Sequence, residues 1–333
     1  MLYVSTRNKA DAFTAYHALY KDRAPDGGMF VPFRLPFYDR EQIGALCSDS
    51  FADTVAQVLS QFFSVHLNAW DVEFCIGRYP FKLNTMSHRA VVAELWHNPG
   101  ASFAYVQQAL YNKISADDDK NVKPSYWSKI AIYIAVLFGI YTELSRSGLS
   151  VEDIALPADN ASALLAVWYA RKMGLPVGTI ICGCKEDNQL WDFFNKGTLD
   201  MNSKQPDCME HLIYHSLGIG HVYKYLQAAE KKGFYHLNPE ELSRLSRGMT
   251  AVVSGEQRVR SAISGIYRST GSLYCPATAM SYGTLQDYRS RTAQTRGTLL
   301  LAEHSPVHFL EEISEAVGQS TTELKMQLTS IKE

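Results

Sequence analysis

The sequence lacks several features that would assign it to a class at once. Its six cysteines are few for 333 residues, which favours free thiols in a reducing compartment over a disulfide framework. Its 32 basic and 34 acidic side chains nearly cancel, so no excess charge favours nucleic acid or an anionic membrane. No basic segment followed by an apolar run opens the sequence, so we expect no signal peptide and a cytoplasmic protein.

Long hydrophobic runs and familiar cofactor motifs are also missing. The longest apolar run, 130–141, is too short to cross a bilayer and predicts a buried helix. No Walker loop or dinucleotide fingerprint occurs. Cys182 and Cys184 have no second Cys/His pair at zinc spacing, so we expect no metal site. His211 and His215 lie four residues apart on a predicted helix, which we interpret as a polar helix face rather than a metal pair.

The clearest unit that is present is an alternation of strands and helices between residues 153 and 197. We expect a strand at 153–156, a loop at 157–160, a helix at 161–173, a strand at 177–182 and a helix at 188–196. Gly174 and Gly197 stand where helix C-terminal residues belong. This alternation predicts an α/β fold with a parallel sheet covered by helices.

The other expected elements flank this unit. Before it we expect strands at 3–7, 29–31 and 91–96, helices at 11–20 and 104–114, two helices between 43 and 62, a polar linker at 83–90, an acidic loop at 116–120, and a helix from Ser125 to Ser145. After it we expect a polar helical segment at 203–249, helices at 256–269, 279–289 and 309–317, and a strand at 297–302. The domains expected are a helical N-terminal subdomain, 1–90, and an α/β domain, 91–333.

Several segments, in this order, resemble a known family. They are Ser5-Thr6-Arg7, 24–32 (Ala-Pro-Asp-Gly-Gly-Met-Phe-Val-Pro), 124–130, 155–176, 185–197, 270–279 and 302–309. The family is threonine synthase, a pyridoxal-phosphate enzyme of fold type II, with the tryptophan synthase β-like fold. The resemblance implies a three-layer sheet domain. It also implies an ancestral carbon–oxygen lyase of amino-acid biosynthesis, which converts O-phosphohomoserine to threonine.

The resemblance implies a lysine that bonds to the cofactor, and this sequence lacks it. Residues 97–106 align with the family's His-Gly-Pro-Thr-Leu-Ala-Phe-Lys-Asp-Phe, which places Ala104 at the lysine position. A methyl group cannot bond covalently to the cofactor aldehyde. The next lysine, Lys113, is about 13 Å further along a helix at roughly 1.5 Å per residue.

Two further family features are absent. The loop 157–162 contains no glycine where the family has a glycine-rich cradle for the cofactor phosphate. Asp159 adds negative charge there, and we interpret Asp159, Asn160 or Ser162 as a helix N-cap. Between Phe103 and Trp127 the family's small mobile domain, with its substrate loop, is largely missing.

These three departures favour a binding or regulatory pseudoenzyme over a catalyst. We expect no catalytic residue and no cofactor. The partner would be a protein or a small phosphorylated amino acid in the remnant cleft, and a homodimer stays open. The remnant cofactor positions are His97, Phe103, Asp159, Asn160, Ser162 and Thr278. The alternative is an active threonine synthase, or a related enzyme with altered chemistry, which would use pyridoxal phosphate.

Overall fold

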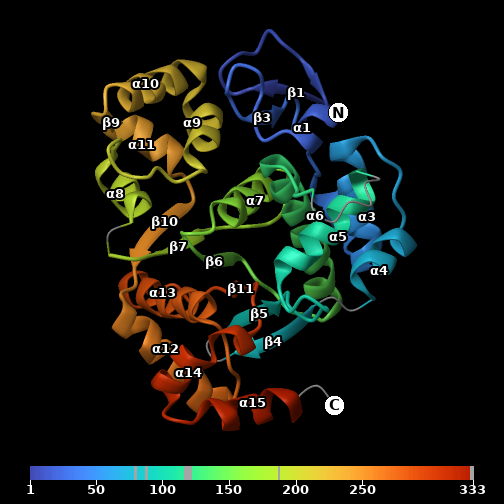
Figure 1. The fold of residues 1–333 in the computed structure, drawn as a ribbon, viewed down its shortest axis with the longest axis vertical. Helices are drawn as coiled ribbons and strands as arrows, with labels where there is room; N and C mark the ends of the chain where they lie inside the picture. Colours follow the sequence, from blue (N-terminus) through green and yellow to red (C-terminus); the bar gives the residue numbers. More distant parts are fainter. Residues whose placement is uncertain (79–80, 87–88, 116–121, 187, 331–333) are drawn as a thin grey trace.

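A six-stranded mixed sheet lies at the centre of the protein, as the computed structural model in Figure 1 shows. The structure describes residues 1–78, 81–86, 89–115, 122–186 and 188–330, so the predicted loop at 116–120 lies outside the described residues. The strands, in sheet order, are β10 (Met249–Val253), β7 (Ile180–Cys184), β6 (Asp153–Pro157), β11 (Thr298–Ala302), β5 (Ala90–Glu94) and β4 (Lys82–Met86). All pairs are parallel except β4 with β5. The predicted α/β fold is confirmed.

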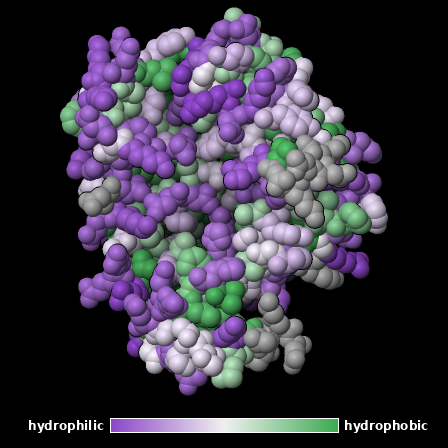
Figure 2. All heavy atoms as spheres, in the orientation of Figure 1, coloured by the Kyte–Doolittle hydropathy of each residue, from purple (hydrophilic) through white to green (hydrophobic). Residues whose placement is uncertain are grey.

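The sheet is the middle one of three layers. Along β11, Leu299 and Leu301 belong to the core that includes α6 (Tyr126–Arg146) and α7 (Ala161–Lys172). Leu300 belongs to the opposite core, with α12 (Glu256–Thr270) and α13 (Pro276–Thr292). This alternation follows from the two-residue period of a strand. Outside these cores, hydrophilic residues predominate on the face shown in Figure 2.

Helix α6 is the main buried helix, as its apolar run predicts. Ser125 is its N-cap and accepts a hydrogen bond from the Ser128 backbone N–H at 3.1 Å. The helix is long and apolar enough to span a membrane, but 83% of its apolar window is buried inside the protein. This burial is that of a core helix.

The N-terminal region is a small sheet with helices around it. Its strands, in order, are β2 (Phe13–Thr14), β1 (Leu2–Ser5) and β3 (Phe30–Pro32). Its helices are α1 (Ala15–Tyr20), α2 (Arg40–Leu46), α3 (Phe51–Phe63) and α4 (Ala69–Ile76). The helix expected from residue 11 begins only at Ala15, because residues 13–14 pair with β1. The prediction of a linker at 83–90 is wrong, since β4 joins the central sheet there.

The segment after the β–α unit is less helical than predicted. The last helix of that unit is α8 (Gln189–Lys196), and the segment after it contains β8 (Thr198–Asp200), α9 (Met209–Leu217), α10 (Ile219–Glu230), β9 (Phe234–His236) and α11 (Pro239–Leu245). The chain ends in η1 (Pro306–Phe309), α14 (Leu310–Val317) and α15 (Thr321–Ser330). The strands β8, β9 and β10 and the helices α4 and α15 were not predicted from the sequence.

The two histidines on α9 do not form a polar surface, so that prediction is wrong. His211 is 1% exposed, and His215 is only partly exposed. The Tyr169 hydroxyl lies 2.8 Å from His211 Nδ1 and 2.8 Å from His215 Nε2. Burial, the largest cause, lowers the pKa of His211 to about 3 and that of His215 to about 4. Both imidazoles are therefore neutral at pH 7.

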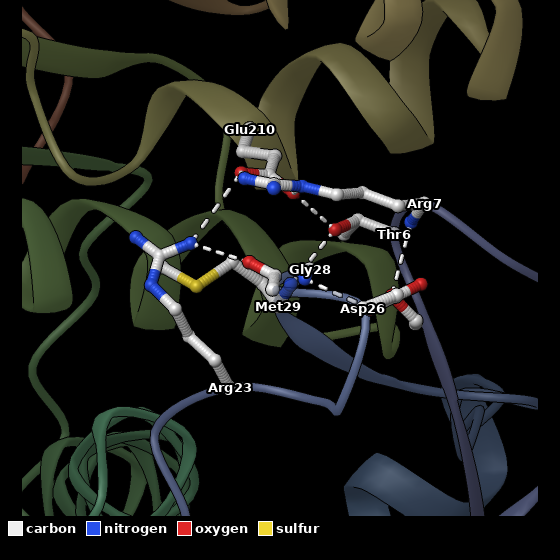
Figure 3. Close-up of polar contacts among 9 residues, drawn as sticks. Thr6, Arg7, Arg23, Asp26, Gly28, Met29 and Glu210 are labelled. Atoms are coloured by element: carbon white, nitrogen blue, oxygen red, sulfur yellow. Dashed lines mark hydrogen bonds and ion pairs between the residues drawn. The ribbon is translucent and has the colours of Figure 1, made fainter.

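A buried carboxylate joins α9 to the N-terminal sheet, as Figure 3 shows. Glu210 accepts hydrogen bonds from Arg7 Nε and Nη2, both at 3.0 Å, and from the Thr6 hydroxyl. Arg23 approaches the same carboxylate to 3.7 Å. The Thr6 hydroxyl in turn accepts from the Met29 backbone N–H. The first residues of the chain are thereby fixed to a segment about 200 positions later.

Candidate functional site

The carboxyl ends of the parallel strands meet at one edge of the sheet, where ligands bind in α/β proteins. Backbone hydrogen bonds join the segments that follow β5 and β11. Leu95 N–H donates to the Ala302 carbonyl at 2.8 Å, and Phe103 N–H donates to the Glu303 carbonyl at 2.7 Å. These bonds place the start of α5 (Phe103–Ser115) beside the end of β11.

Phe103 and Ala104 form the first turn of α5 but differ in their surroundings. The Phe103 ring is buried and lies 4.5 Å, centroid to centroid, from the ring of Tyr133. Ala104, at the position of the expected lysine, is exposed. The nearest following lysine, Lys113, points elsewhere, since its Nζ is 2.7 Å from Asp71 on α4.

The centre of this edge is a cluster formed by Tyr133, Asn160 and Glu303, which we call the carboxyl-end cluster. The Tyr133 hydroxyl donates to Glu303 Oε1 at 2.7 Å. Asn160 Nδ2 donates to Oε1 at 2.7 Å and to Oε2 at 2.8 Å. One carboxylate thus connects α6, the β6–α7 loop and the end of β11.

The β6–α7 loop is held by side-chain hydrogen bonds. Asn160 is the N-cap of α7, since its Oδ1 accepts from the Ala163 backbone N–H at 3.0 Å. The Ser162 hydroxyl donates to the same oxygen at 2.9 Å. The Asp159 carboxylate lies outside this network, 3.1 Å from Lys185 Nζ and 3.1 Å from Asn188 Nδ2. Of the three N-cap candidates, Asn160 is therefore the cap.

A second carboxylate lies at the end of β5. Glu94 is 5% exposed, and its Oε2 is 2.6 Å from His97 Nε2. Its Oε1 accepts from Asn84 Nδ2 on β4. This group has no hydrogen bond to the carboxyl-end cluster among the described residues.

The last predicted position, Thr278, is on the first turn of α13. Thr278 is 1% exposed, and its hydroxyl lies 3.2 Å from the Cys275 Sγ. Burial, the largest cause, and the Glu303 carboxylate raise the pKa of the Cys275 thiol. The thiol is therefore in its neutral form rather than a nucleophilic thiolate.

The structure brings together some of the predicted positions and separates others. Phe103, Asn160 and Ser162 lie around Glu303, whereas Asp159 is paired with Lys185 and His97 with Glu94. Sequence reasoning missed Tyr133 and Glu303 as site residues. One signal was available for Glu303, because it is a charged residue directly after a buried strand in a predicted parallel sheet.

Burial dominates the electrostatics of the carboxyl-end cluster. It raises the pKa of Glu303 to about 7, although the hydrogen bonds from Tyr133 and Asn160 act in the opposite direction. The pKa of Tyr133 is raised well above its usual value by burial and by Glu303. Near neutral pH, Glu303 is thus divided between its charged and neutral forms, and its charge depends on what approaches it.

The substitution Glu303→Gln is expected to change how stability depends on pH. A carboxyl whose pKa is higher in the folded than in the unfolded protein loses its contribution to stability as the pH rises from about 4.5 to about 7. Glutamine has no proton to lose, so the variant should gain about 2 kcal/mol over the parent between pH 5 and pH 8. Urea unfolding of both proteins across this range measures the difference. A constant difference would contradict the shifted pKa of Glu303.

Comparisons with known proteins agree with this architecture. A family model described as "Threonine synthase N terminus" matches residues 2–78. Threonine synthase of Pseudomonas aeruginosa is 24% identical over 208 residues, which cover 58% of this chain and 44% of that protein. Human "Threonine synthase-like 1" is 22% identical over 174 residues, 46% of this chain and 23% of that protein. The chain is related to the threonine synthases. The resemblance recognised in the sequence is confirmed.

Solved threonine synthases share the fold of this threonine synthase-like chain. The structure from Brucella melitensis, with bound PLP, has a TM-score of 0.81 and 18% identity, covering 96% of this chain and 91% of that one. The yeast structure has a TM-score of 0.78 and 14% identity, covering 95% and 90%. The chain spans less than half the length of the curated relatives given above. The likeness to the solved structures therefore shows the fold.

Proposed function

We propose that this threonine synthase-like protein acts by binding, as a regulatory pseudoenzyme, and has lost pyridoxal-phosphate catalysis. The observation that carries the proposal is the carboxyl-end cluster. Glu303 accepts hydrogen bonds from Tyr133 and Asn160 at the edge of the sheet where the resemblance implies a cofactor. When bound, pyridoxal phosphate would supply an electron sink for the substrate carbon. The residues present do not fit that group, for the following three reasons.

The first reason is the lack of a suitable amine. Ala104 replaces the expected lysine, and Lys113 is paired with Asp71. Lys185 is the lysine that contacts the β6–α7 loop, through Asp159, but its side chain is 68% exposed. An exposed ammonium that is already engaged in an ion pair is a poor nucleophile.

The second reason is the lack of a phosphate cradle. The loop 157–162 contains no glycine, and Asn160 caps the N-terminus of the helix α7 that follows it. A backbone donor that an anion would need is thereby already engaged, at Ala163. The Lys185 ammonium, which contacts this loop, is already paired with the Asp159 carboxylate.

The third reason is the acidic character of this edge of the sheet. Glu303 presents a carboxyl group to Asn160 and Tyr133, and Glu94 is buried at the end of β5. These groups accept hydrogen bonds, so they favour an ammonium or amide donor over an anion. The amino group of a small amino acid, or a donor side chain from a protein partner, matches this chemistry.

Borohydride trapping tests the proposal. After incubation with pyridoxal phosphate and reduction, we expect no stoichiometric adduct by mass spectrometry and no cofactor absorbance above that of free reagent. Ala104→Lys should behave like the parent, because restoring the amine leaves Asp159, Asn160 and Glu303 in place. Lys185→Gln serves as the matched control, since it removes the exposed amine at the same edge and should lower any background labelling.

Two results would overturn the proposal. A single lysine of the parent labelled to one equivalent would show a working cofactor site. Release of phosphate from O-phosphohomoserine, with threonine as product, would establish the alternative of an active lyase.

A further inference from the structure

A cationic pocket lies between the C-terminal ends of three helices, α7, α9 and α11. It has a volume of about 270 Å³. The residues that line it include Trp168, Arg171, Lys172, His215, Arg244 and Arg247. Helix α7 has 12 residues, so its length of about 18 Å, at roughly 1.5 Å per residue, separates this pocket from the carboxyl-end cluster. The pocket is therefore separate from the site described above.

Arg171 is fixed in the pocket by the backbone that leads into β10. Its Nη1 donates to the carbonyls of Arg247, at 3.0 Å, and Gly248, at 3.1 Å. Gly248 has a φ of +70°, and a Cβ there would lie 2.0 Å from the same Nη1. Only glycine suits both the backbone angle and the approach of the guanidinium. A pre-positioned guanidinium loses little entropy when it binds an anion.

Part of the positive charge serves the helices themselves. Cations at helix C-termini stabilise the free carbonyls, as Arg244 does by donating from Nη2 to the Ser216 carbonyl at 3.0 Å, and Arg171 holds the backbone after α11. These bonds occupy one nitrogen of each guanidinium. The other nitrogens, and the Lys172 ammonium, which lies 5.3 Å from the Trp168 ring centroid, remain able to donate.

No carboxylate balances these charges. Among the residues that the structure describes, none of Arg171, Lys172, Arg244 and Arg247 forms an ion pair. The charged neighbours that act on the buried groups are also cations. Burial and then Arg247 lower the pKa of Arg171, and burial, Lys172 and Lys9 lower the pKa of His215. The pocket thus concentrates positive potential.

We propose that the cationic pocket binds the phosphate group of a small anion. A phosphate has two negative charges and acceptor oxygens that match convergent guanidinium and ammonium donors. Lys172, Arg244 and Arg247 are exposed, so the ligand can reach them. Trp168, which is 5% exposed, also lines the pocket. Free phosphate and a phosphorylated amino acid share this chemistry, and the experiment distinguishes them.

Isothermal titration with inorganic phosphate, and separately with O-phospho-L-serine, tests the proposal in a low-chloride buffer. Saturable binding is expected for at least one of them, and tighter binding of O-phospho-L-serine would identify an organic phosphate as the ligand. The double variant Arg244→Glu, Arg247→Glu should weaken binding at least tenfold. Lys224→Glu on α10 is the matched control, because it reverses an exposed charge outside the pocket and should bind like the parent.

The result does not depend on the loss of catalysis, because the pocket and the carboxyl-end cluster share no residue. Circular dichroism and thermal unfolding establish that the double variant is folded. Trp168→Phe supplies a second readout, since it should remove the change in tryptophan fluorescence that accompanies binding. The proposal is overturned if neither probe gives a saturable heat of binding at millimolar concentration. It is also overturned if chloride binds as tightly as the two phosphate probes, or if the double variant keeps the affinity of the parent.

Discussion

Replacing Glu210 with alanine is expected to lower the free energy of unfolding by about 3 kcal/mol, because it removes the shared partner of two arginines and a hydroxyl. Its side chain is 7% exposed, and that of Arg7 is 23% exposed. The substitution leaves the Arg7 guanidinium partly buried without its two 3.0 Å hydrogen bonds. Because Arg7 keeps some contact with water, we expect the lower end of the usual cost. Urea unfolding followed by circular dichroism measures it.

The control for this prediction is Glu315→Ala. Glu315 also pairs with an arginine, Arg260, at 3.3 Å, but the two side chains are 63% and 61% exposed. An exposed pair contributes at most about 1 kcal/mol, so this variant should resemble the parent. If both substitutions lowered the free energy of unfolding equally, the contact between the N-terminal sheet and α9 would contribute no special stability.

His211→Gln is expected to make the protein less stable at pH 7 and to lose this disadvantage as the pH falls to 4. Both His211 and His215 have folded-state pKa values below the ordinary 6.5. The unfolded chain therefore binds protons first, and the stability that neutral histidine provides is lost as the pH drops below about 6.5. Each such group contributes a slope of up to about 1.4 kcal/mol per pH unit. The difference between parent and variant should shrink by about 2 kcal/mol across this range.

The difference between two proteins is the quantity to measure, because Glu303 changes stability in the opposite direction over an overlapping range. It is present in both proteins, so its effect cancels. His236→Gln is the control, since His236 is exposed and contacts the Thr198 hydroxyl. Because His236 lies on the surface, this variant should have a stability at pH 7 close to that of the parent. An NMR titration that places the pKa of His211 near 6.5 would contradict the prediction.

The buried histidine pair also has a preferred proton arrangement. His211 Nε2 is buried and has no hydrogen-bond partner among the described residues. A buried N–H without an acceptor costs more than a lone pair without a donor. The favoured arrangement therefore places the His211 proton on Nδ1, where it donates to the Tyr169 hydroxyl, which donates to His215 Nε2. Burial keeps both rings neutral, and this chain of donors fixes which nitrogen of His211 carries the proton.

The fold was predictable wherever local signals and burial agreed. The β–α unit that begins at residue 153 has apolar strands, capped helices and glycine ends, and its elements match to within a few residues. Ser125 and Gly197 act as the caps that the sequence predicts. By contrast, β4 reads Lys-Leu-Asn-Thr-Met and lies at the edge of the sheet, half exposed. A polar edge strand has no alternation strong enough to distinguish it from a linker.

The site was less predictable because its contacts join distant parts of the chain. Asn160 and Glu303 are 143 positions apart, and no spacing rule relates them. The sequence identified Asn160 as an N-cap candidate from its place before a helix, which is a local property. That the same side chain also binds Glu303 depends on β11 lying beside β6, which is a property of the sheet order.

The sheet order has a consequence for how the protein is made. Strand β11 separates β5 from β6, yet it is the last strand to leave the ribosome. Until it arrives, the two halves of the sheet, β4–β5 and β6–β7–β10, each present an open inner edge with unpaired amides and carbonyls. At about 5–20 residues per second, more than 200 residues separate the synthesis of β5 from that of β11 by some tens of seconds at the slower rate. A nascent chain that stalls before residue 298 would therefore expose two unpaired strand edges. Such a chain would be a substrate for chaperones and proteases.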